Sequence, residues 1–265
     1  MEVHTFAKKL LMLIDTHAHL YTGEFDTDRN EMIERTIQSG IKKMILPNID
    51  ESSIEGMLSL SDQYPDNCFP LIGLHPTSVT PDYKSQITLV EKWLSDRKFY
   101  GIGEIGIDLY WDKSYLKEQE EAFRYQVKIA KSANLPIVIH VRDSFQEVMK
   151  IIEEEQDGLL TGVFHCFSGD AEDAQKVFDL GFYIGIGGVV TFKNTNLREV
   201  LKETGLKHVV LETDAPYLAP VPYRGKRNES SYLSIIAARV AEATGTSEME
   251  VARITTENAE RLFGI

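Results

Sequence analysis

Residues 12–19 of the chain, Met12 to His19, read MLIDTHAH, so that an apolar run leads directly into a pair of histidines. Consecutive apolar residues are typical of strands that are buried on both faces of a parallel sheet. Residues i and i+2 of an extended chain point the same way, so the imidazoles of His17 and His19 can reach one point. The stretch predicts a buried strand with polar chemistry at its C-terminal end.

Seven similar runs follow along the 265 residues, and helical patterns with apolar residues at three- and four-residue spacing lie between them. The eight runs, of which the first begins at Leu11, are residues 11–15, 43–47, 69–74, 100–105, 137–141, 162–167, 182–186 and 209–211. The helical patterns are residues 27–39, 52–63, 83–95, 117–133, 144–155, 171–179 and 197–203, followed by 232–243 and 247–262. This alternation predicts a (β/α)₈ barrel of the TIM type with an extra C-terminal helix.

An open doubly wound sheet is the alternative arrangement of such elements. The closed barrel is favoured because polar residues follow most of the runs, and closure brings those strand ends together. The sequence has no linker, repeat or low-complexity tract, so we expect a single domain over residues 12–265. We interpret residues 1–11 as an N-terminal extension.

The composition limits the function classes. Hydrophobic residues make up 43% and charged residues 26% of the chain, which is typical of a globular protein. The net charge of −13 argues against a broad basic face for nucleic acid, although not against a nuclease whose contacts lie in a metal-lined pocket. We expect no membrane span and no obligate protein partner. Two cysteines and an apolar N-terminal run too short for a signal peptide predict a cytoplasmic location.

Five of the seven histidines follow apolar runs, at the end of a barrel where active sites lie. They are His17, His19, His75, His140 and His165. Histidine and carboxylate groups that converge on one barrel mouth have the composition of a metal site. A single histidine at a strand end, such as His140 or His165, can also be a core residue; their matched positions on successive strands favour the ligand interpretation.

Two carboxylates complete the candidate site. Glu104 lies in an apolar run, and a buried carboxylate needs a cation close by. The alternative is an ion pair, but no lysine or arginine lies in the adjacent run. The two oxygens of Glu104 can bridge two ions. Asp214 follows the eighth run, next to the first in a closed barrel, where it can bind a metal and accept a proton from an attacking water.

Five segments in order resemble the TatD family of metal-dependent deoxyribonucleases, which are amidohydrolase-like hydrolases with a TIM-barrel fold. The segments are residues 14–19, 103–108, 139–142, 165–169 and 212–216, and the resemblance extends from about residue 12 to residue 265. It implies two divalent metal ions, with magnesium, manganese and zinc as candidates. The ligands it implies are His17, His19, Glu104 and Asp214 for one ion, and Glu104, His140 and His165 for the other.

The resemblance also implies substrate contacts. Arg224 lies in the basic loop over residues 218–230, where it can contact a phosphate, and His75 is a second candidate. Ser230 stands where the family usually has proline, so the exact path of the loop does not follow from the resemblance. Tyr110 and Trp111 can stack on a base, or seal packing at the barrel mouth. Asp108 and Arg142 can orient ligands or contact substrate. Glu212 can support Asp214 from behind, or cap or pair locally.

The resemblance implies a 3′-5′ exonuclease that cleaves phosphodiesters in single-stranded DNA by means of a metal-activated water. Two alternatives use the same barrel: a small-molecule amidohydrolase or lactonase, and an ester hydrolase acting on D-aminoacyl-tRNA. A lysine on the fifth strand would favour the first, but His140 occupies that strand. A non-enzymatic binding protein is disfavoured because all six candidate ligands are present.

Overall fold

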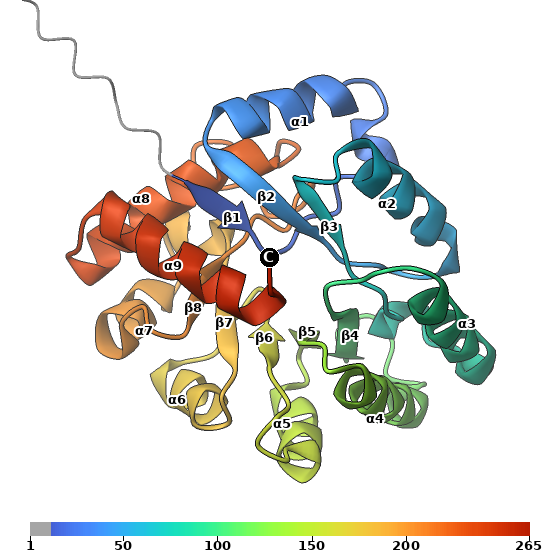
Figure 1. Ribbon diagram of the computed structural model, residues 1–265. Helices are drawn as coiled ribbons and strands as arrows, with labels where there is room; N and C mark the ends of the chain where they lie inside the picture. The colour runs from blue at the N-terminus through green and yellow to red at the C-terminus, as the bar shows by residue number, and fades with distance from the viewer. Residues whose placement is uncertain (1–11) are drawn as a thin grey trace, which may run out of the picture.

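The structure, a computed structural model, describes residues 12–265; the predicted extension over residues 1–11 lies outside the described residues. Strands form a ring and helices surround it (Figure 1). The strands are β1 (Leu13–Asp15), β2 (Ile41–Leu46), β3 (Cys68–Pro70), β4 (Ile102–Asp108), β5 (Ile137–Arg142), β6 (Gly162–Phe164), β7 (Tyr183–Ile186) and β8 (Val209–Leu211). The ring with its outer helices is the predicted (β/α)₈ barrel.

The α-helices lie close to the predicted ranges. They are α1 (Arg29–Gln38), α2 (Glu51–Gln63), α3 (Tyr83–Asp96), α4 (Leu116–Ala133), α5 (Phe145–Glu155), α6 (Ala171–Asp179), α7 (Leu197–Thr204), α8 (Leu233–Thr244) and α9 (Glu248–Phe263). Short 3₁₀ helices lie in the loops: η1 (Gly23–Phe25), η2 (Pro76–Ser78), η3 (Gly188–Thr191) and η4 (Ser230–Tyr232). None of the helices within residues 12–265 is both long and apolar enough to cross a bilayer.

All strand pairs are parallel, and two seams close the ring. Strands β1 to β3 form one ladder and β4 to β8 another. Single parallel bridges join them, between Ile72 and Ile102 at one seam and between Ala18 and Ala215 at the other. At the second seam the amide of Asp214 donates to the carbonyl of His17 over 2.9 Å. Closure therefore places the residues after β8 beside those after β1.

The C-terminal ends of three strands lie three or more residues from the ends of the predicted runs. Regular pairing in β3 ends at Pro70, because Ile72 then bridges to β4 as an isolated pair. Strand β4 continues past Ile105 to Asp108, since it remains paired with β5. Strand β6 ends at Phe164, and the chain turns at Cys166, where φ is +47°. Apolar content predicted these strands, but hydrogen-bond pairing sets their ends.

The interior of the barrel is a packed apolar cluster that α9 covers. Inward side chains of the strands pack with Ala259, Leu262 and Phe263 of α9; the strand residues are Ile14, Ile45, Phe69, Leu71, Val138, Val163, Tyr183 and Val210. The end of α9 and the C-terminus lie over the centre of the ring (Figure 1). The larger apolar cluster lies between strands and outer helices. Because α9 covers one end, polar chemistry is left to the other.

Candidate metal centre

The predicted ligands meet around the carboxylate of Glu104 on β4, at the C-terminal ends of the strands. On one side of it lie the histidines after β1. The Oε2 atom of Glu104 is 3.2 Å from Nε2 of His17 and 3.5 Å from Nε2 of His19. The same two nitrogens lie 3.7 and 3.8 Å from Oδ1 of Asp214, which follows β8. These four side chains are the set predicted to share one ion.

The other oxygen of Glu104 faces a different set of histidines. Its Oε1 atom lies 2.7 Å from Nδ1 of His140 on β5 and 2.7 Å from Nε2 of His165 after β6. The side chain of Glu104 is only 3% exposed, so both oxygens face protein groups rather than bulk water. Each oxygen of Glu104 therefore faces its own pair of imidazoles, and the two pairs meet where the rings of His17 and His165 stack, with their centres 3.8 Å apart.

The partners of each imidazole decide which ring nitrogen is free. The hydroxyl of Tyr21 donates to the carbonyl of Pro47 over 2.5 Å, so it accepts from Nδ1 of His19, 3.0 Å away. This leaves the lone pair of His19 Nε2 for the centre. Nε2 of His140 lies 2.9 Å from Oδ2 of Asp108, which leaves its Nδ1 facing Glu104. A carboxylate or hydroxyl behind a histidine is typical of metal sites.

His75 lies at the centre as well, but with the opposite orientation of its proton. Its Nδ1 accepts a hydrogen bond from the amide of Thr77 over 3.1 Å. The proton of the neutral ring is therefore on Nε2, which lies 3.3 Å from Oε1 of Glu104. A protonated nitrogen cannot ligate a metal. This geometry fits a hydrogen-bond donor towards Glu104, and the contact of His75 with substrate stays a prediction.

The electrostatics of the centre favour an ionised Glu104. Burial opposes its charge, but His165, His75 and His17 outweigh burial and hold the pKa of Glu104 well below its usual range. Burial lowers the pKa of His17 far below its usual value. Despite burial, Glu104 raises the pKa of His165 well above the ordinary one. Burial raises the pKa of Asp214 to about 6.

Side chains behind the centre hold it in place, and sequence reasoning had not assigned them. Buried Asp15 accepts from the amides of His17 and Thr213, at 3.3 and 2.9 Å, and so ties β1 to β8. The side chain of Asn48 donates to the carbonyl of Gly73 over 2.6 Å, and its backbone carbonyl accepts from the amide of Glu104 over 3.0 Å. Position at the end of an apolar run was the available signal for both, since Asp15 ends the first run and Asn48 follows the second.

Glu212 supports a different residue from the one expected. It is fully buried, and its Oε1 accepts from the amide of Cys166 over 2.5 Å and lies 3.6 Å from Nδ1 of His165. The sequence predicts instead that Glu212 supports Asp214 or forms a local cap or pair. The left-handed turn at Cys166 brings that amide back to β8, which explains the contact.

The basic loop contributes less to the centre than expected. Arg224 is exposed, and its guanidinium lies 4.2 Å from the ring centre of Phe192. In the part of the chain that the structure describes, Arg224 has no hydrogen bond or ion pair with the centre. Arg227 binds Asp28 through both oxygens, at 2.6 and 2.8 Å. Arg227 thus anchors the loop, and Arg224 remains the arginine of the loop that is free to meet a substrate.

The residues present fit divalent cations. Within residues 12–265, no lysine or arginine pairs with Glu104, so its charge faces imidazoles alone. Nitrogen atoms of His17 and His19 lie 3.2 Å apart, and buried Nδ1 of His17 has no hydrogen-bond partner. Imidazole and carboxylate together are typical ligands of zinc and other transition metals. Convergent lone pairs around one buried anion are what a cation would bind.

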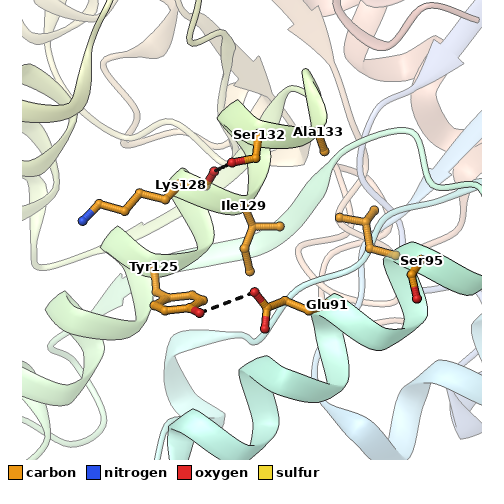
Figure 2. Close-up of a pocket in the computed structure, with 8 residues that line it drawn as sticks. Glu91, Ser95, Tyr125, Lys128, Ile129, Ser132 and Ala133 are labelled. Carbon is orange, nitrogen blue, oxygen red and sulfur yellow. Dashed lines mark hydrogen bonds between the residues drawn. The ribbon is translucent and has the colours of Figure 1, made fainter.

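A hollow on the outer surface of the protein lacks the cluster of histidines and carboxylates that the metal centre has. It has a volume of about 570 Å³ and lies on the outside of the barrel between α3 and α4 (Figure 2). Glu91, Tyr125 and Lys128 line it together with small and apolar residues, and it contains no histidine. The site is therefore assigned from converging ligands rather than from size.

Comparison with known proteins agrees with this assignment. The sequence model of the family described as TatD related DNase matches residues 14–264. The chain is 40% identical to "Uncharacterized metal-dependent hydrolase YabD" of Bacillus subtilis, over 96% of this chain and 100% of the relative. It is 31% identical to "3'-5' ssDNA/RNA exonuclease TatD" of Salmonella typhimurium, over 96% and 99% of the two chains.

Among solved structures, the fold is similar to that of YjjV, a TatD homologue from Escherichia coli K12. The TM-score is 0.91 at 27% identity, and the match covers 97% of this chain and 99% of that one. The chain therefore belongs to the TatD-related DNase family of metal-dependent hydrolases.

Proposed function

We propose that this member of the TatD family removes nucleotides from the 3′ end of single-stranded DNA, at a centre for two divalent ions that Glu104 bridges. The observation that carries the proposal is the position of Glu104, whose two oxygens face two separate groups of histidines. The name of the Salmonella relative, an exonuclease for single strands, supports the substrate.

Each group of ligands has a defined share in this proposal. His17, His19 and Asp214 would hold one ion and His140 and His165 the other, with Glu104 common to both. Bound magnesium, manganese or zinc ions would lower the pKa of a water and stabilise the leaving oxygen of the phosphodiester. Tyr21 and Asp108 keep the free nitrogens of His19 and His140 directed at the centre.

Two residues take part in proton transfer and substrate binding. Oδ1 of Asp214 lies 3.7 and 3.8 Å from Nε2 of His17 and His19, and its side chain is 13% exposed, so it can accept the proton of an attacking water. His75 donates from Nε2 towards the phosphate, and Arg224 adds a charge-assisted contact from the loop. The chain thus supplies a base, a donor and a cation around one scissile bond.

The test is a cleavage assay on 5′-labelled single-stranded DNA with purified protein and Mg²⁺ or Mn²⁺. We expect products that shorten from the 3′ end and that disappear with EDTA. Glu104→Ala should abolish cleavage, whereas Glu91→Ala in the groove between α3 and α4 should not change it. If the metal-loaded protein leaves DNA intact but hydrolyses D-aminoacyl esters, lactones or amides, the nuclease proposal is wrong and one of those activities replaces it.

A further inference from the structure

Exposed apolar side chains gather at the mouth of the barrel. Nine large apolar side chains are exposed within residues 12–265, and five of them lie in two loops of the site. Tyr110 and Trp111 follow β4, and the other three, Tyr217, Leu218 and Val221, follow β8. Single exposed apolar residues are ordinary, but a cluster beside a site indicates a binding surface.

The first aromatic pair is fixed to the centre through one carboxylate. Oδ1 of Asp108 accepts from the amides of Tyr110 and Trp111, at 2.9 and 3.2 Å, while Oδ2 lies 2.9 Å from Nε2 of His140. The guanidinium of Arg142 lies 3.9 Å from the ring centre of Tyr110. Trp111 remains 69% exposed. The backbone that carries these rings is therefore held beside the His140 side of Glu104, and most of the indole is exposed.

The second aromatic side chain, Tyr217, lies on the His19 side of Glu104. The ring of Tyr217 is 6.1 Å from that of His19, and its amide donates to the carbonyl of Asp214 over 2.8 Å. Asn228 donates to the carbonyl of Tyr217 over 2.7 Å. Tyr217 is 48% exposed. Since His19 faces one oxygen of Glu104 and His140 the other, the two aromatic groups flank the centre.

We propose that Trp111 with Tyr110 on one side, and Tyr217 on the other, stack on unpaired nucleobases that flank the scissile phosphate. This inference rests on the proposed function and states how the site selects single strands. Stacking accepts every base, because each has a π-face. The net charge of −13 gives little long-range attraction for a phosphate backbone, so stacking adds binding to the local contacts of the metal ions and Arg224. Paired bases in a duplex offer no free faces.

Binding is tested without cleavage through the fluorescence of Trp111. The chain has two tryptophans, so Trp93→Phe leaves Trp111 as the single reporter, and strands with phosphorothioate linkages resist turnover while the ligands stay intact. With Mg²⁺ we expect a short oligothymidylate to quench the emission saturably. An abasic strand of equal length, with the same phosphates, should quench little. Equal quenching by both strands, or none by either, would overturn the proposal.

Kinetics on oligothymidylate separate stacking from fold effects. Trp111→Ala and Tyr217→Ala should each raise KM roughly 5- to 150-fold, the range for one lost stacking contact. Trp111→Phe should restore most of the affinity. Tyr125→Ala is the matched control, because Tyr125 is also 48% exposed but lies in the outer groove beside Glu91 (Figure 2). It should leave KM and kcat unchanged.

The two proposals fail in different ways. If wild-type protein with Mn²⁺ does not cut the oligothymidylate while the reporter protein still binds it selectively, the nuclease proposal falls and the stacking surface stands. If the wild-type protein cuts but Trp111→Ala and Tyr217→Ala have the same KM as the control Tyr125→Ala, the stacking surface is wrong.

Discussion

At the residue scale, histidines of the same centre differ in where they carry their proton. Tyr21 and Asp108 place the single proton of a neutral His19 or His140 ring on the nitrogen that faces away from Glu104. The amide of Thr77 does the reverse to His75 and places its proton towards Glu104. Five histidines around one carboxylate are thus not equivalent, and the difference is set by partners behind each ring.

This difference predicts separate effects on metal content. His140→Ala removes a proposed ligand, so the protein should lose tightly bound metal and activity together. His75→Ala removes a donor, so metal content should stay at the wild-type level while kcat/KM falls roughly 10- to 1000-fold, the scale of one lost hydrogen bond to a charged group. Elemental analysis after dialysis measures the first and a cleavage assay the second. Loss of metal from both variants in equal measure would contradict the assigned tautomer of His75.

Sequence reasoning could predict the ligands because each follows or lies in an apolar run. His17, His19, His140 and Asp214 all stand where a buried strand ends, and the structure brings them together around Glu104. The supporting groups could not be predicted in the same way. Tyr21 reaches His19 through a bend of the chain after β1, and Glu212 reaches His165 only because Cys166 turns back. Such contacts depend on backbone paths that no spacing encodes.

At the element scale, β4 and β5 approach so closely that one glycine is required. A Cβ atom on Gly106 would lie 2.1 Å from the carbonyl oxygen of His140, and φ there is +141°. Gly158, in the loop after α5, also has a positive φ of +88°, but a Cβ atom there would meet nothing within 4 Å. A side chain at either position would strain the backbone, but only at Gly106 would it also clash with a neighbouring strand.

Gly106→Ala should therefore destabilise the protein by at least about 3 kcal/mol, because β5 must move to admit the methyl group. Gly158→Ala should cost only about 1–2 kcal/mol, from the left-handed backbone. Urea unfolding compares the two. Since Gly106 is paired with His140 in the sheet, the first variant should also weaken metal binding. Equal destabilisation by both variants would show that the sheet tolerates the contact.

An ion-pair network joins α1 to the loop before η4. Arg35 binds Glu229 at 2.6 Å and Asp28 at 2.9 Å, and Arg227 binds Asp28 at 2.6 Å. Hydrogen bonds from Arg227 and Arg35 hold the pKa of Asp28 well below its usual range. Burial of Glu229 opposes ionisation, but Arg35 still lowers the pKa of that carboxyl. The network therefore stabilises the fold only while the carboxylates of Asp28 and Glu229 are ionised.

The sign of the pH effect follows from these lowered pKa values. Carboxylates whose pKa is lower in the folded state stabilise it above their unfolded pKa of about 4, and this contribution is lost as the pH falls below that. Tm should therefore begin to fall near pH 5 and should fall most steeply below about pH 4. Asp28→Asn should lower Tm at pH 7 and flatten this slope. Asp66→Asn, at an exposed aspartate without an ion pair among the described residues, should leave the slope as it is. If the slope is unchanged in Asp28→Asn, the ion-pair network does not cause the loss of stability in acid.

Element positions were predictable and element ends were not. Apolar spacing predicted α6 over residues 171–179 and β8 over residues 209–211 as the structure has them. The ends of β4 and β6 differ because pairing with β5 extends one, while a left-handed residue stops the other. Those causes lie in the neighbouring strand and in one backbone angle, and neither belongs to the periodicity of the run itself.

At the scale of the whole molecule, α9 and the metal centre occupy opposite ends of one barrel. The last residues of α9 fill the interior beneath the strands, and Phe263 is 4% exposed there. Met249, at the start of the same helix, is 58% exposed. The stability of the strand ring therefore depends on the far end of the chain.

Phe263→Ala should lower the free energy of unfolding by about 3–5 kcal/mol, as expected when a buried aromatic ring leaves a cavity. Met249→Ala should change it by less than about 0.5 kcal/mol, because that side chain is at the surface. Chemical denaturation gives both values. A small effect at Phe263 would indicate that the ring of strands holds without its cover.

The most direct test of the two-ion centre is a titration of metal-free protein with Mn²⁺, followed by equilibrium dialysis and electron paramagnetic resonance. We predict two tightly bound ions per chain with the spectrum of a magnetically coupled pair, and loss of that coupled pair in Glu104→Gln. One ion per chain, or a coupled pair that persists in Glu104→Gln, would contradict a bridging role for Glu104.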